Sequence, residues 1–148
     1  MGHAMGTYST FDHTADVGLE VRGEDLADLL ATAARAVFDQ MLQDRPGSVA
    51  ATETLHVRCE ADLAPDEAEV LVAWLQELLF RFETDALMPI TVHVEEATGE
   101  GVRARVGFGR FDPERHGTRL EVKAVTYHGL QVQEAPDGSW HARLILDV

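Results

Sequence analysis

The strongest periodic pattern in the chain is PDEAEVLVAWLQELLFRFE, at residues 65–83. Its apolar side chains recur at steps of three and four residues, which indicates one buried face of an α-helix. Pro65 and two following acidic residues are typical of a helical first turn. Gln76, Glu77 and Arg81 interrupt the apolar run, which is therefore too polar to span a membrane. We predict a core helix whose buried stripe is Leu71, Trp74, Leu75, Leu78, Leu79 and Phe82.

A second helix is predicted over residues 25–42, where apolar side chains again recur at helical spacing. Asp25 is a plausible N-cap, because its carboxylate can accept a hydrogen bond from a free amide of the first turn. Residues 45–48, Arg-Pro-Gly-Ser, stop the chain from continuing as helix.

The remainder of the chain predicts strands. Alternating or apolar segments occur at residues 17–22, 53–59, 90–94, 102–106, 120–125, 130–133 and 140–146. Short turns between the later strands favour antiparallel pairing. We predict a two-layer α+β domain, with a mainly antiparallel β-sheet and two helices packed on one face. We assign residues 11–148 to this single domain and residues 1–10 to an N-terminal lead, disordered or added for expression.

Composition narrows the function classes. The chain has 148 residues, 45% of them hydrophobic, and a formal net charge of −14. This charge repels phosphate backbones and anionic membranes, so we expect neither stable nucleic-acid binding nor membrane attachment. A cation or a basic protein is the partner that it attracts. The lone cysteine, Cys59, excludes an internal disulfide or a multi-cysteine metal site and fits a cytoplasmic location.

Familiar catalytic motifs are missing from the sequence. Gly107-Phe108-Gly109 lacks the third glycine and the lysine of a phosphate-binding loop. The seven histidines show no zinc-binding spacing, and no nucleophile–base arrangement is evident from spacing.

Carboxylates near the two ends of the chain are candidate metal ligands. Asp147 precedes the terminal residue Val148, whose α-carboxylate would be a second anion beside it. If the first and last predicted strands lie side by side, Asp16 joins them as a third carboxylate. Oxygen ligands of this kind suit a hard divalent ion. The alternative is that Asp16 caps a turn.

A third segment, at residues 122–130, combines Lys123, Thr126, Tyr127 and His128 in one strand and turn. Lys123 is the only lysine in the chain. We predict that it alternates with Val122 and Ala124 on a strand and faces away from them. It is then either a solvated surface lysine or a positive charge presented to a partner.

Four strings in the sequence closely resemble the archease family. They are FDHTADVGLEVRG at 11–23, VAWLQELLFRFE at 72–83, EVKAVTYHGLQV at 121–132 and the terminal ILDV at 145–148. The acidic loop DPERH at 112–116 is also similar to that family, and the resemblance runs in order over residues 11–148.

The resemblance implies a non-enzymatic accessory protein of the RtcB-type RNA ligase, a manganese- and GTP-dependent enzyme of tRNA splicing and RNA repair. Archeases promote guanylylation of the ligase histidine and sustain multiple turnover. The family's metal site, described with calcium, corresponds to Asp16, Asp147 and Val148. Lys123 corresponds to a functional family lysine, and we place His13 and His128 with it as candidate partner-contact residues.

Two other function classes stay open. One is a chaperone-like modulator of a tRNA-modifying enzyme such as a methyltransferase. The other is a small metal-dependent phosphohydrolase that acts through the carboxylates. A hydrolase turns over phosphate esters alone, whereas an archease needs its ligase.

Overall fold

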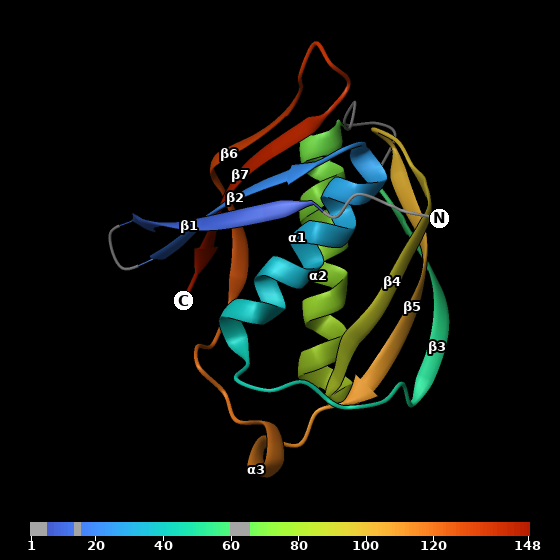
Figure 1. Ribbon diagram of the computed structural model, residues 1–148, viewed down its shortest axis with the longest axis vertical. Coiled ribbons are helices and arrows are strands. Elements are labelled where there is room, and N and C mark those ends of the chain that lie inside the picture. Colours follow the sequence, from blue (N-terminus) through green and yellow to red (C-terminus); the bar gives the residue numbers. More distant parts are fainter. Residues whose placement is uncertain (1–5, 14–15, 60–65) are drawn as a thin grey trace.

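The structure is a computed structural model that describes residues 6–13, 16–59 and 66–148. Within these residues, seven strands form two antiparallel sheets, and two long helices pack against both (Figure 1). The elements are β1 (Thr7–His13), β2 (Asp16–Gly23), α1 (Leu26–Met41), β3 (Ala51–Arg58), α2 (Glu67–Asp85), β4 (Leu87–Ala97), β5 (Gly101–Arg110), α3 (Pro113–His116), β6 (Ala124–Glu134) and β7 (Trp140–Asp147). The predicted α+β class is confirmed.

Both long helices begin where the sequence predicts. The Asp25 carboxylate accepts a hydrogen bond from the Asp28 amide at 2.7 Å, and the Asp66 carboxylate accepts one from the Glu69 amide at 3.0 Å. Each aspartate therefore satisfies one of the amide groups that a helix start leaves unpaired.

The core lies between the helices and the inner faces of the two sheets. Helix α1 packs on β2 and β4, and α2 packs on β6, β4 and β3. Trp74 is fully buried, and its indole Nε1 donates a hydrogen bond of 2.9 Å to the carbonyl of Leu30. This contact ties α2 to α1 and confirms the predicted core helix. No helix within the described residues is long and apolar enough to cross a bilayer.

The sheet layer differs from the prediction because it consists of two separate sheets. One has the order β1-β2-β7-β6 and the other β3-β5-β4. Alternation predicts that a segment is a strand, whereas its pairing partner depends on tertiary contacts that the local pattern does not contain. Both helices therefore contact two sheets rather than one face of a single sheet.

The folded chain also begins before residue 11. β1 starts at Thr7 and pairs with β2 from Thr7↔Arg22 to His13↔Asp16. The Tyr8 hydroxyl donates a hydrogen bond of 2.7 Å to the Asp39 carboxylate on α1. Thr7, Ser9 and Thr10 are polar, and a polar edge strand carries little hydrophobic pattern, so the sequence alone does not predict this strand.

The strand predicted at residues 120–125 is also corrected. β6 begins at Ala124, and Lys123 precedes it. Val122 and Val125 are both buried and Lys123 is exposed between them, so the strict alternation predicted around Lys123 does not hold. Residues 118–120 bond instead to the end of α1, through a Leu42↔Thr118 bridge and a 2.7 Å hydrogen bond from the Arg119 amide to the Met41 carbonyl.

Candidate functional site

The pairing of β2 with β7 brings the two predicted carboxylates together. The antiparallel register runs from Gly23↔Trp140 to Val17↔Leu146, and continuing it by one residue sets Asp16 opposite Asp147. The Cβ atoms of such directly opposed residues are about 4.5–5.5 Å apart. The sequence analysis requires the first and last predicted strands to lie side by side, and β2 and β7 do so.

Both aspartates belong to the outer face of the sheet. Leu19 and Val21 of β2 and Leu144 and Leu146 of β7 are fully buried toward the helices. Because successive side chains of a strand alternate in direction, Asp16 and Asp147 lie on the opposite face. Asp16 is half-buried and Asp147 is exposed, so both carboxylates are reachable from solution.

One further predicted residue, His13, falls into the same row across the sheet, and Lys123 directly precedes another member of the row, Ala124. His13 of β1 is the register partner of Asp16, and Ala124 of β6 is the partner of Asp147. The backbone amide of Lys123 donates a hydrogen bond of 2.8 Å to the carbonyl of Asp147. Lys123 is thus anchored beside the last strand with an exposed side chain. The side chain of His13 lies outside the described residues.

His128 lies in an irregularity of β6 rather than in this row. The register between β6 and β7 shifts between Thr126 and Gln131, and Gly129 has a φ of +70°. The His128 amide donates a hydrogen bond of 2.9 Å to Oγ1 of Thr126. The bulge therefore places His128 on an exposed edge, and the glycine adopts the positive φ that this bend requires.

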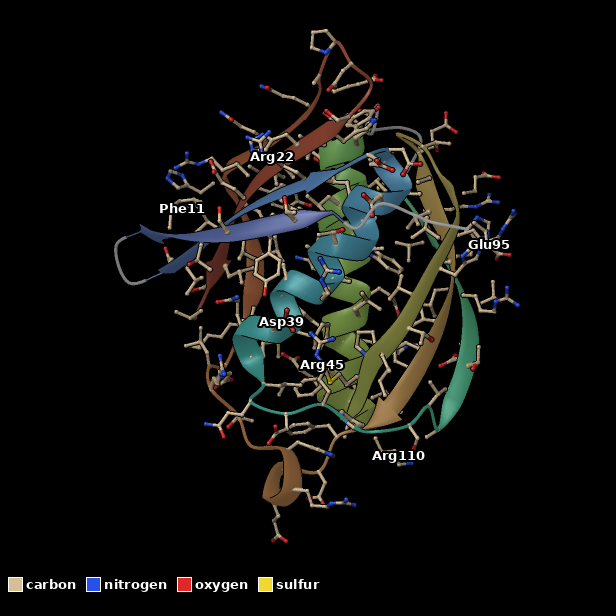
Figure 2. All side chains as sticks on the ribbon, in the orientation of Figure 1. Phe11, Arg22, Asp39, Arg45, Glu95 and Arg110 are labelled. Atoms are coloured by element: carbon tan, nitrogen blue, oxygen red, sulfur yellow. The ribbon has the colours of Figure 1, made fainter. Side chains whose placement is uncertain are left out.

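An apolar cluster borders the carboxylates, and sequence reasoning missed it. The Phe11 ring of β1 (Figure 2) covers Gly18, where any Cβ atom would overlap the ring. Arg143 stacks on the same ring at 4.2 Å and forms an ion pair of 3.8 Å with Glu20. Ile145, the register partner of Gly18, is only 3% exposed although it lies on the outer face.

The one sequence signal for this cluster is the glycine in FDHTADVG. A glycine inside a strand often marks a close approach of another group to the backbone. Phe11 and Ile145 form an apolar patch one step along the strands from Asp16 and Asp147, on the same face.

The donor set at this end of the sheet fits a hard divalent cation. Asp16 and Asp147 supply oxygen atoms only, and calcium accepts carboxylate, carbonyl and water oxygens. Within residues 6–13, 16–59 and 66–148, no group of three or more His, Cys, Asp or Glu side chains could hold a metal ion. The available ligands are the carboxylates of two aspartates and oxygen atoms of neighbouring residues such as Val148. This set fits calcium better than zinc, which is usually bound by four ligands that are mostly His nitrogen and Cys sulfur atoms.

Cys59, half-buried near the start of α2, lacks the setting of a reactive nucleophile. Burial, reinforced by Glu69 and Asp66, raises the pKa of its thiol. The nearby Tyr127 hydroxyl donates a hydrogen bond of 3.2 Å to Glu69, and burial likewise raises the pKa of Tyr127. Because the thiolate is the reactive form, Cys59 is disfavoured as a nucleophile at neutral pH.

Comparison with known proteins defines the class of this α+β protein. The Archease protein family (MTH1598/TM1083) matches residues 8–148. A curated relative, "Protein archease" of Methanopyrus kandleri, is 37% identical over 145 residues, which cover 95% of this chain and 99% of that protein. The Pyrococcus furiosus "Protein archease" is 30% identical over 147 residues, covering 97% of this chain and 100% of that protein.

A solved structure agrees with the fold. The solution structure of Methanobacterium thermoautotrophicum protein 1598 superposes with a TM-score of 0.74 at 30% identity, covering 95% of this chain and 98% of that one. The chain belongs to the archease family.

Proposed function

We propose that this protein is a non-catalytic activator of an RtcB-type RNA ligase and acts in tRNA splicing and RNA repair. In this role it promotes guanylylation of the ligase histidine by GTP, with release of pyrophosphate, and sustains multiple turnover. The observation that carries the proposal is the register that sets Asp16 opposite Asp147 and anchors Lys123 to Asp147. These residues come from the strings that carry the archease resemblance, and the chain belongs to that family.

We further propose that Asp16, Asp147 and Val148 hold a divalent cation, with calcium as the resident ion. A bound cation would supply positive charge at the end of a strongly acidic molecule. A bound divalent cation would offset the repulsion between the two aspartates, because like charges directly opposite on a sheet are unfavourable.

Lys123 is proposed as the contact to the ligase. Its backbone is fixed by the hydrogen bond to Asp147, while its side chain is exposed. On a chain with net charge −14, it is a compact positive charge that can reach a phosphate of GTP or a carboxylate of the ligase. We place His13 and His128 at the same contact. The acidic surface would steer the molecule toward a basic, RNA-binding partner rather than toward RNA.

The experiment mixes a ligase of the same source with GTP and Mn²⁺, with and without this protein, and measures the fraction of guanylylated ligase. We expect the protein to raise that fraction and to hydrolyse neither GTP nor p-nitrophenyl phosphate alone. Hydrolysis by the purified chain that is lost in Asp16→Asn would favour the phosphohydrolase. Faster tRNA methylation without a ligase present would favour the methyltransferase modulator.

A further inference from the structure

A cavity of about 520 Å³ opens at the C-terminal ends of both long helices, and the segment that lines one side of it directly precedes Lys123. Met41 and Leu42 at the end of α1 and the buried Val122 form its apolar floor. Phe82 of α2 forms an aromatic wall. The volume falls in the range of ligand pockets, about 300–1,000 Å³.

The walls of the cavity are held in place by several contacts. The segment that closes one side is hydrogen-bonded to α1, since the Arg119 and Leu120 amides both donate to the Met41 carbonyl at 2.7 and 3.3 Å. Phe82 packs against Phe38 and Phe111, with ring centroids 5.7 and 5.2 Å apart. The aromatic wall is therefore part of the core packing and is formed before any ligand arrives.

The electrostatics of the cavity favour a cation. Glu83 of α2 and Glu121 both line it, and both are exposed. Neither carboxylate forms an ion pair with a residue in the part of the chain that the structure describes. The ends of α1 and α2 contribute negative partial charge, because helix dipoles are negative at the C-terminus and the last turn of each helix has no basic residue.

We infer that this cavity is a docking site for an arginine side chain presented by a basic segment of a partner protein. The aliphatic part of an arginine side chain can pack on the apolar floor, and its planar guanidinium can stack on the ring of Phe82. The guanidinium N–H groups can donate hydrogen bonds to the carboxylates of Glu83 and Glu121. Charge complementarity selects this occupant over a neutral apolar one. The inference does not depend on the cation site or on the ligase, and it is tested without either.

The test titrates the ¹⁵N-labelled full chain with the peptide acetyl-Gly-Arg-Gly-amide and follows the backbone amides by NMR. Shifts are expected at residues 41–42, 82–83 and 118–122. The matched peptide carries citrulline, a neutral arginine analogue of nearly equal shape. Arginine should bind about fivefold more tightly than citrulline, because two exposed ion pairs each contribute little. Equal binding of the two peptides, or shifts elsewhere, would overturn the inference.

Variants locate the charges that matter. Glu83→Gln/Glu121→Gln should bring the arginine peptide to the affinity of the citrulline peptide. The control Glu100→Gln/Glu134→Gln removes two exposed carboxylates outside the cavity and should bind as the wild type does. Thr118→Arg, at the cavity wall, should compete with the peptide by placing a tethered guanidinium in the site. Undiminished binding in the first variant would contradict the inference.

Sedimentation tests the other occupant, a second copy of this chain, which itself contains arginine. A dimer that dissociates in Glu83→Gln/Glu121→Gln would assign the cavity to self-association and overturn the partner assignment. We expect the same monomer mass for the wild type and the variant.

Discussion

At the residue scale, the proposed cation site depends on Asp16 and Asp147, which the pairing of β2 with β7 sets opposite each other. Their chemistry is readable from the sequence, since carboxylates beside a strand end indicate a hard cation. Their proximity is not, because it depends on the pairing of β2 with β7. The Phe11 ring over Gly18 was missed for a related reason. A glycine in a strand signals a close approach but does not identify the group that approaches.

Replacing Asp16 by Asn removes one charged oxygen ligand from the proposed cation site. Calorimetry with calcium should show an affinity at least about tenfold lower, because a charged ligand is lost. Glu20→Gln, on the same strand and face, is the control and should bind calcium normally. Equal calcium binding in wild type and Asp16→Asn would exclude this site.

Lys123→Ala should leave folding almost unchanged, because the side chain is exposed and its anchoring hydrogen bond is made by the backbone. We expect a stability change within about 0.5 kcal/mol and unchanged calcium binding. Stimulation of ligase guanylylation should fall severely, and Lys123→Arg should be intermediate because a guanidinium differs in shape and hydration. If Lys123→Ala stimulates guanylylation as wild type does, the lysine is only a surface residue.

At the element scale, the two long helices were predictable and the edges of the sheets were not. Helix α2 combines apolar side chains at helical spacing with an aspartate cap, and both signals are local. β1 pairs through its backbone and carries Thr7, Ser9 and Thr10, so its hydrophobic pattern is weak. At Lys123 the alternation fails because the preceding residues bond to the end of α1 rather than to a strand.

Gly18→Ala tests the packing of β1 on β2. The added methyl group would overlap the Phe11 ring, so we expect a loss of about 1–3 kcal/mol in the free energy of unfolding, measured in urea. In a Phe11→Ala background the same substitution should cost almost nothing, and the difference is the coupling between the two residues. Additive losses would show that the ring does not occupy the space above Gly18.

At the scale of the whole molecule, the two long helices each pack against both sheets, and the chain carries a formal net charge of −14. The single domain and the basic partner remain predictions from composition, since they rest on overall size and charge. The start of the domain was set too late because the contribution of β1 is tertiary. Tyr8 bonds to Asp39, and the Gly6 carbonyl accepts a hydrogen bond of 2.9 Å from Arg35.

Deletion of residues 1–10 should therefore destabilise the protein, whereas deletion of residues 1–5 should not. The longer deletion removes the Tyr8 hydroxyl contact and the hydrogen bonds of half of β1, at least about 2 kcal/mol together. For a chain of this size that corresponds to a fall in Tm of roughly 5 °C or more. A Tm equal to that of the shorter deletion would show that the domain begins at residue 11.

The proposed function requires that the carboxylate pair serves the activation of a ligase. The most direct measurement is the number of RNA molecules joined per ligase molecule, with the protein present at substoichiometric amounts. We predict many joined RNAs per ligase with wild type and with Glu20→Gln, and no more than a single round with Asp147→Asn or without the protein. Multiple turnover with Asp147→Asn equal to that with wild type would contradict the account.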